Sequence, residues 1–161
     1  MYYPSSTSYY SVGYEDQYTD LSDYDFNDLV VAYRKKFGLN EALQVITVNA
    51  EGYLVARGGS YDNSWHLRIL IPEGSRADGN YQLSIPPEVS SGSVRIKYID
   101  TSSEIDISLF ENTTTLFYDQ ASPYTNTIWD GKHVLGHKFT FEITLSSPVA
   151  LEQMDQAPFE P

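Results

Sequence analysis

The chain has 161 residues, 41% of them hydrophobic, which is enough for one globular domain with a substantial core. Its formal net charge of −12 argues against a nucleic-acid partner, whose phosphates attract Lys and Arg, and against an anionic membrane surface. The absence of cysteine excludes disulfides, thiolate metal sites and thiol catalysis. No apolar run is long enough for a transmembrane helix, so membrane insertion is not expected.

The first eleven residues are rich in Tyr, Ser and Thr and carry no charged side chain. This composition predicts that residues 1–11 form a linker or a loosely held arm. The pair Tyr9-Tyr10 leaves open the alternative that an edge strand begins there. We expect residues 12–161 to form a single β-sandwich domain, beginning with a short strand over Val12–Tyr18.

A dense acidic segment follows this strand. Asp23-Tyr24-Asp25-Phe26-Asn27-Asp28 contains three carboxylates and one carboxamide, and Glu15 and Asp16 lie upstream. Oxygen groups packed this closely repel one another unless a cation lies between them, and calcium takes six to eight such ligands. We therefore expect a calcium ion, Ca²⁺, whose ligands are Asp23, Asp25, Asn27, Asp28, Glu15 and Asp16.

The spacing of these ligands predicts a loop rather than a strand. Alternate residues on a strand stand about 6.6 Å apart, whereas two oxygens on one calcium lie at most about 5 Å apart. Tyr24 and Phe26 would then anchor the loop against the core. An EF-hand does not fit, because its sixth position should be Gly and is Asp28, and its twelfth should be Glu and is Arg34. The alternative is a solvated acidic turn without an ion.

The rest of the sequence predicts short strands, because no stretch shows a convincing 3.6-residue helical period of apolar residues. We expect Arg34-Lys35-Lys36 to be a solvated strand end and Glu51-Gly52 to be a turn. Many short strands with turn signals every ten or so residues predict an all-β fold, an antiparallel β-sandwich that is jelly-roll-like. The expected strands are Leu29–Tyr33, Ala42–Ala50, Tyr53–Arg57, Trp65–Ile71, Tyr81–Ile85, Ser93–Ile99, Glu104–Phe110, Thr115–Tyr118 and Lys138–Leu145.

A second loop, Tyr61-Asp62-Asn63-Ser64, follows a Gly-Gly pair. One interpretation is that this loop meets the acidic segment and shapes a binding pocket, and the alternative is an ordinary turn built by Asp and Asn. His66 reads as an isolated structural or surface residue. His133 and His137 have the H-x3-H spacing of a zinc site, but no third ligand lies near them in the sequence.

The sequence contains no nucleophile elbow, phosphate-binding loop or H-E-x-x-H motif. Adjacent carboxylates suit cation binding better than the spaced acid and base of a glycosidase. We therefore do not expect an enzyme.

The acidic segment resembles a family signature. Tyr14-Glu15-Asp16, a short spacer and Asp23–Val31 resemble the F-E-D-L and D-Y-D-F-N-D-L-V-V motifs of the LruC-domain family, found in bacterial exported and surface proteins. Val55–Asn63 resembles the A-x-G-A-S-Y-H-N segment of that family, and Leu151–Phe159 resembles its closing region. A related D-x-D-F-N-D signature occurs in calcium-dependent ligand-binding domains of long bacterial adhesins.

This resemblance implies a secreted or cell-surface bacterial protein that works as a recognition or adhesion module. The ion would order a loop that holds a peptide or carbohydrate ligand on another cell or surface, with Tyr61, Asp62 and Asn63 in contact with that ligand. We expect a monomer or a weak homo-oligomer. The alternative is a calcium-stabilised structural spacer without its own ligand. Asp62 stands where family members often have His, and members usually continue beyond Pro158-Phe159, so a truncated C-terminus is expected.

Overall fold

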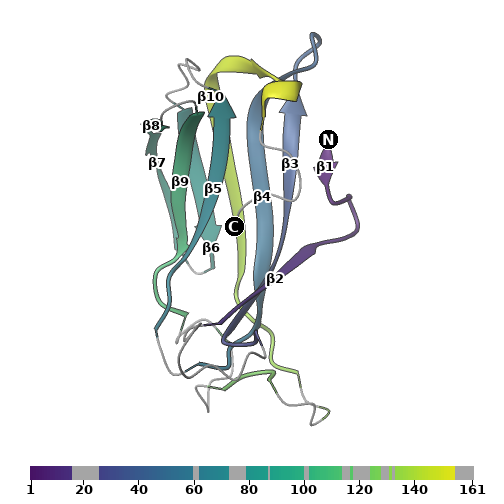
Figure 1. The fold of residues 1–161 in the computed structure, drawn as a ribbon, viewed down its shortest axis with the longest axis vertical. Helices are drawn as coiled ribbons and strands as arrows, with labels where there is room; N and C mark the ends of the chain where they lie inside the picture. The colour runs from purple at the N-terminus through teal and green to yellow at the C-terminus, as the bar shows by residue number, and fades with distance from the viewer. Residues whose placement is uncertain are drawn as a thin grey trace.

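Two antiparallel β-sheets pack face to face in the computed structural model (Figure 1). The structure describes residues 1–15, 26–59, 62–72, 79–86, 88–99, 102–113, 117, 124–127, 131 and 133–154. Besides strands, these ranges include a short 3-10 helix, η2 (Leu151–Gln153), and no helix in them is long and apolar enough to cross a membrane. The predicted all-β sandwich is therefore confirmed.

The larger sheet has the strand order β1-β3-β4-β10-β6-β7, and β2 also pairs with β3. The smaller sheet has the order β5-β9-β8. The strands of the larger sheet are β1 (Tyr2–Tyr3), β2 (Tyr10–Tyr14), β3 (Leu29–Leu39), β4 (Gln44–Ala56), β6 (Gly79–Ile85), β7 (Glu88–Val94) and β10 (Lys138–Ala150). Those of the smaller sheet are β5 (Trp65–Pro72), β8 (Lys97–Ile99) and β9 (Ser102–Phe110).

The core forms where apolar residues alternate along strands of both sheets, because successive side chains of a strand point to opposite faces. The strands β5, β9 and β10 show the predicted alternation, and their apolar faces are buried. The inner layer of the smaller sheet consists of Leu67, Ile69, Ile71, Ile105, Ile107 and Leu109, and that of β10 consists of Phe139, Phe141, Ile143 and Leu145.

An aromatic cluster joins the two sheets at the end of the sandwich where β5 begins. The ring centroid of Trp65 lies 5.9 Å from that of Tyr33, 6.2 Å from that of Phe110 and 5.6 Å from that of Phe139. Phe110 and Phe139 meet edge to face at 5.5 Å. Tilted and edge-on contacts of this kind add to the stabilisation from burial.

Gly52 leaves the space that the Phe139 ring occupies. A Cβ atom at position 52 would lie 2.7 and 2.8 Å from two carbons of that ring, and it would also collide with the carbonyl oxygen of Ala32. The predicted turn at Glu51-Gly52 is therefore wrong, because β4 runs straight through both residues. The glycine meets a packing requirement rather than a turn requirement.

The predicted solvated end at Arg34-Lys35-Lys36 is also wrong, because β3 continues to Leu39. Lys35 is fully buried on the inner face, and its Nζ donates a hydrogen bond of 3.2 Å to the carbonyl oxygen of Arg68 in the opposite sheet. A long side chain can bury its methylene stem and place its charge at a backbone acceptor. Lys35 thus links the two sheets.

Residues 1–11 differ from the expected loosely held arm. Both β1 and β2 pair with the same edge of β3, Tyr2 opposite Lys36 and Tyr10 opposite Tyr33. The alternative of an edge strand beginning near Tyr9-Tyr10 matches β2. The extent of the domain stays a prediction.

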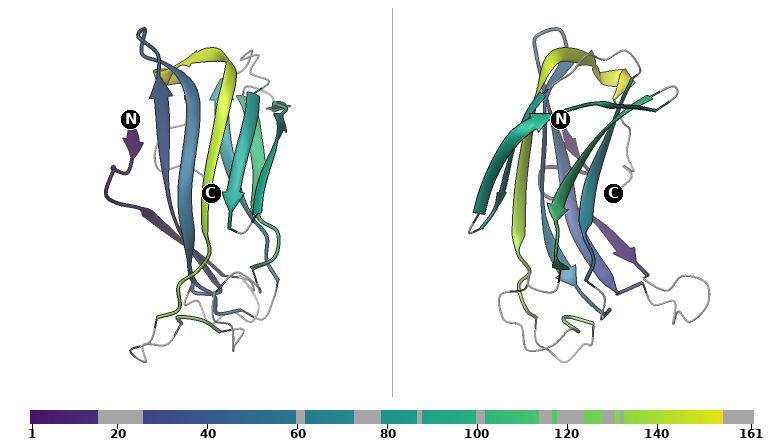
Figure 2. Two further views of the ribbon diagram at one scale, coloured as in Figure 1. Left: turned by 180° about the vertical axis from the view of Figure 1, so that it is seen from behind. Right: turned by 90° about the vertical axis from the view of Figure 1, so that its left-hand side faces the viewer.

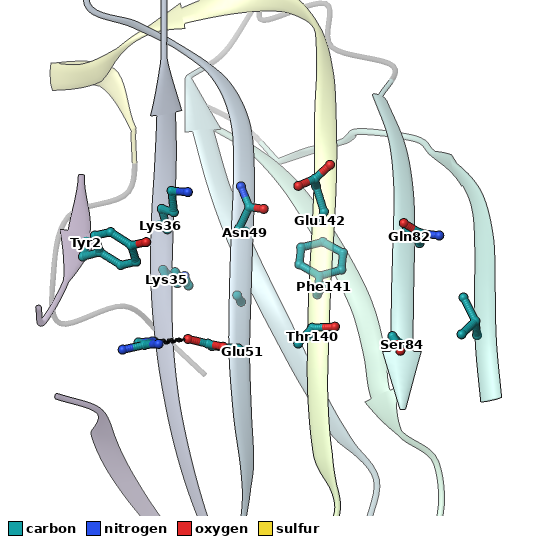
Figure 3. A pocket seen from close by; sticks show the side chains of 13 residues that line it. Tyr2, Lys35, Lys36, Asn49, Glu51, Gln82, Ser84, Thr140, Phe141 and Glu142 are labelled. Atoms are coloured by element: carbon teal, nitrogen blue, oxygen red, sulfur yellow. Dashed lines mark hydrogen bonds and ion pairs between the residues drawn. The ribbon is translucent and has the colours of Figure 1, made fainter. Parts of the chain in front are cut away.

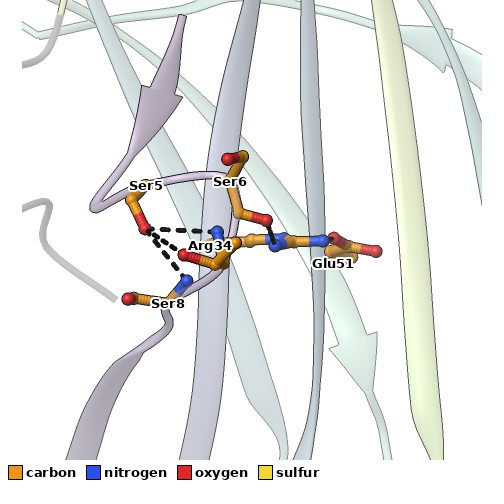
Figure 4. Close-up of polar contacts among 6 residues, drawn as sticks. Ser5, Ser6, Ser8, Arg34 and Glu51 are labelled. Carbon is orange, nitrogen blue, oxygen red and sulfur yellow. Dashed lines mark hydrogen bonds and ion pairs between the residues drawn. The ribbon is translucent and has the colours of Figure 1, made fainter.

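Arg34 holds the connection between β1 and β2 against the sheet (Figure 4). Its guanidinium pairs with Glu51, donates to the carbonyl oxygen of Ser6 and lies 4.8 Å from the ring centroid of Tyr9. Within the connection, the Ser5 hydroxyl accepts hydrogen bonds of 3.2 and 3.0 Å from the amides of Thr7 and Ser8.

The chain passes from one sheet to the other where a single strand, Ser93–Ile99, was predicted. The strand β7 ends at Val94, and β8 begins at Lys97 in the smaller sheet (Figure 2). Of the predicted strand Thr115–Tyr118, only Phe117 lies within the described residues, and it forms an isolated bridge with Gly136.

We predict that Gly52→Ala destabilises the protein by about 2–3 kcal/mol, because the added methyl overpacks the Phe139 ring. Phe139→Leu alone should cost about 1–2 kcal/mol through the space it leaves. If the Phe139 ring causes the clash, the double variant should lose about 1 kcal/mol less stability than the two single variants lose together. Denaturant unfolding of the four proteins measures this coupling, and strict additivity would assign the clash to the carbonyl oxygen of Ala32 and not to the ring.

We predict that Arg34→Ala costs about 1–2 kcal/mol and increases hydrogen exchange at the amides of β1 and β2, because two contacts with the connection and the ion pair with Glu51 are lost together. The matched control is Arg95→Ala, which removes an exposed arginine between β7 and β8. This control should change stability by no more than about 0.5 kcal/mol. Equal losses in the two variants would contradict the anchoring role of Arg34.

Candidate functional site

A hollow of about 520 Å³ lies at the end of the sandwich where β2 ends and where β3 and β5 begin. Three residues singled out in the sequence line it together: Glu15, Asp28 and Asn63. Because these residues are far apart in the chain, the fold creates this grouping. The volume falls within the range of small-molecule and peptide side-chain pockets.

Glu15 lies beside the described part of the acidic segment, residues 26–28. The carboxylate of Glu15 accepts a hydrogen bond of 3.3 Å from the backbone amide of Phe26. Gly13 allows this approach, because a Cβ there would collide with the carbonyl oxygen of Phe26. Phe26 itself has a positive φ of 52° and is 48% exposed, so the prediction that it anchors the loop in the core is wrong. Tyr24 lies outside the described residues.

The residues that follow β4 contact the acidic segment through Gly58, which precedes the predicted loop Tyr61–Ser64. The amide of Gly58 donates a hydrogen bond of 3.2 Å to the carbonyl oxygen of Asp28. The Cα of Gly58 faces the side chain of Asn27, and a Cβ would collide with Asn27 Oδ1. Two segments separated by about thirty residues of sequence are therefore in direct contact.

Asn63 is fixed in place by a buried threonine. Its amide donates to the Thr113 hydroxyl at 3.2 Å, and its carbonyl oxygen accepts from the Thr113 amide at 3.1 Å. Thr113 is fully buried, so this pair of bonds holds the backbone of Asn63 at the rim of the hollow. Its side chain can then act as a positioned donor and acceptor.

Tyr14 connects the hollow to the aromatic cluster. Its hydroxyl oxygen accepts a hydrogen bond of 3.0 Å from the indole Nε1 of Trp65. Burial raises the pKa of Tyr14, and the hydrogen bond from Trp65 partly offsets that rise. The phenol is therefore neutral at physiological pH, and its hydroxyl hydrogen can be donated to a bound molecule.

The sequence analysis assigned no binding role to His66 and Asp106, which line the hollow together with Arg68. His66 Nδ1 and Asp106 Oδ1 lie 2.9 Å apart, and both side chains are about 40% exposed. They face outward from neighbouring strands, since β5 pairs with β9 with Arg68 opposite Asp106. Strand alternation places each residue on an outer face, but only the pairing register brings them together.

The structure describes only three of the six predicted calcium ligands, Glu15, Asn27 and Asp28. Asp16, Asp23 and Asp25 lie outside the described residues, as does the predicted ligand contact Tyr61. Asn27 adjoins Gly58 without lining the hollow, and Asp62 is exposed and also does not line it. Within the described ranges no three His, Cys, Asp or Glu side chains form a group that could hold a metal. His133 and His137 belong to no such group among the described residues. His133 is exposed, and burial lowers the pKa of His137.

A second hollow, of about 490 Å³, lies on the outer face of the larger sheet (Figure 3). Polar side chains cross this face in register, one from each neighbouring strand. The cationic groups of Arg34 and Lys36 are balanced by the carboxylates of Glu51 and Glu142. One such row consists of Tyr2, Lys36, Asn49, Glu142 and Gln82. The face is thus polar and nearly neutral within a strongly acidic chain.

Comparison with known proteins gives one match. No curated protein and no solved structure matches the chain. A family model described as a domain of unknown function matches residues 44–161, which is more than half of the chain. The matched range includes Asn63, His66 and Asp106 and begins after the acidic segment. The chain therefore belongs to the DUF4842 family.

Proposed function

We propose that this protein is a calcium-dependent recognition module of a secreted or cell-surface bacterial protein. The ion would order the acidic segment at the rim of the hollow, and the hollow would hold part of a peptide or glycan. The observation that carries this proposal is that Glu15, Asp28 and Asn63 line one hollow together. Two oxygen-rich segments thus face the same space.

The charge balance supports a cation at this place. The hollow is lined by the carboxylates of Glu15, Asp28 and Asp106 and by one guanidinium, that of Arg68, in a chain of net charge −12. A divalent ion would reduce the repulsion between these groups and those of the adjoining acidic segment. Calcium accepts carboxylate, carboxamide and carbonyl oxygens with flexible geometry, which suits a set of ligands drawn from loops.

The open shape supports recognition over a purely structural role. A structural metal site is closed by its protein ligands, whereas a binding site leaves concave space beside the ion. Here the space adjoins the aromatic side chains of Tyr14 and Trp65 and the polar pair of His66 and Asp106. Such a mixture of aromatic surface and oriented polar groups is typical of sites for peptides and sugars.

The resemblance of the acidic segment to LruC domains and adhesin domains adds support of a different kind. It concerns residues that precede the range matched by the DUF4842 model. The proposal therefore combines a signature at the start of the chain with a hollow built mostly by later strands.

We predict that calcium raises the midpoint of thermal unfolding by about 5–10 °C at saturating concentration, while magnesium at matched ionic strength has little effect. Asp28→Asn, Glu15→Gln and Asp25→Asn should each reduce the shift. The control is Glu41→Gln, which removes an exposed carboxylate in the hairpin after β3, at the far end of that strand. An absence of any calcium-dependent shift in the parent protein would contradict the calcium site.

We predict that peptides or glycans selected from an array in calcium lose binding in Asn63→Ala and Tyr14→Phe by about tenfold each, because each change removes one hydrogen-bonding group. Both variants should keep the calcium-induced shift in midpoint. A protein that binds calcium but captures nothing from the array would instead be the structural spacer. Loss of calcium binding without loss of ligand binding would separate the ion from recognition.

A further inference from the structure

One edge of the smaller sheet is largely unpaired within the described residues. The strand β9 pairs with β5 from Ser102 to Phe110. On its other edge, β8 pairs only with Ser102 to Glu104. From Ile105 to Phe110, no described strand pairs with that edge. An edge of this length presents a row of backbone donors and acceptors to any extended chain that reaches it.

A groove of about 680 Å³ runs along this edge. On one side its lining is consecutive, from Asp106 to Asn112, as expected where the backbone edge of a strand forms the wall. On the other side its lining includes Leu83, Ile85 and Val94, from strands of the larger sheet. In both Figure 1 and the right-hand view of Figure 2, β9 lies between β5 and β7.

The floor of the groove is apolar. Ile85 is half-buried, and Leu83 and Val94 are 9% and 5% exposed. These side chains belong to the inner face of the larger sheet, which the three strands of the smaller sheet leave only partly covered within the described residues. A strand added beside β9 would place alternate side chains against this floor.

We propose that the groove accepts an extended peptide strand from a partner protein, which pairs with β9 and extends the smaller sheet. The backbone of the guest would bond to the edge from Ile105 to Phe110. Its inward side chains would be apolar, and they would pack on Leu83, Ile85 and Val94. Strand addition of this kind takes affinity from backbone bonds and specificity from alternate side chains.

The charges at the rim of the groove favour a peptide with basic side chains. Glu88, Asp106 and Glu111 are exposed carboxylates at the groove, and Arg95 is the exposed cation there. The guest should therefore carry Lys or Arg at its solvent-facing positions. A second copy of this chain, with its net charge of −12, would be repelled instead.

The test uses a ten-residue peptide of alternating valine and lysine, blocked at both ends, and the full protein. We expect saturable binding at micromolar to millimolar concentration. We also expect slower hydrogen exchange at alternate amides between Ile105 and Phe110, because the other amides already bond to β5. A peptide of the same sequence with N-methylated backbone amides should not bind. Binding that leaves β9 exchange unchanged, or no binding at all, overturns the proposal.

Variants locate the peptide. Ile85→Ser should weaken binding at least tenfold, because it removes apolar floor from a half-buried position. The matched control is Val89→Ser in the same hairpin, since Val89 is 65% exposed and lies on the opposite face. Glu111→Gln, at an exposed position, should weaken binding and reduce its salt dependence even if Ile85→Ser folds poorly. Concentration-dependent dimers that protect the β9 amides without peptide would overturn the proposal in favour of a second copy.

Discussion

The packing of Phe139 over Gly52 and against Trp65 is the contact on which both sheets and the hollow depend. Phe139 belongs to the larger sheet and Trp65 to the smaller one, and their ring centroids lie 5.6 Å apart. The indole then donates to Tyr14, whose strand leads directly to Glu15. One buried cluster thus fixes the separation of the sheets and the position of Glu15 at the hollow.

Alternation of apolar and polar residues was sufficient to predict β5, β9 and β10, because each has one buried and one exposed face. It failed for β3 and β4, where local residue type disagreed with the tertiary environment. The residue type of Lys35 predicts a solvent-exposed position, yet its side chain crosses the core to the carbonyl oxygen of Arg68. The residue type of Gly52 predicts a turn, yet this glycine leaves space for the Phe139 ring. Such contacts form between distant residues, so no short window of sequence contains them.

The candidate site was predictable to a similar degree. The composition of the two segments pointed to their neighbourhood, and Asn63 does line one hollow with Asp28, but the contact through Gly58 with Asn27 and Asp28 was not predicted. The pair of His66 and Asp106 did not follow, because it depends on the register between β5 and β9. A shift of one residue would separate the two side chains onto opposite faces.

The strand β9 serves both the hollow and the groove, since Asp106 lines each of them. Its side chain faces His66 in the hollow, while its backbone belongs to the edge along the groove. A strand that pairs with this edge would restrict the backbone that carries Asp106, and a ligand in the hollow would restrict its side chain. Two ligands that order the same residue affect each other's binding reciprocally, whichever binds first. The arrangement of a three-stranded sheet beside a broader one therefore places the hollow and the groove on one shared strand.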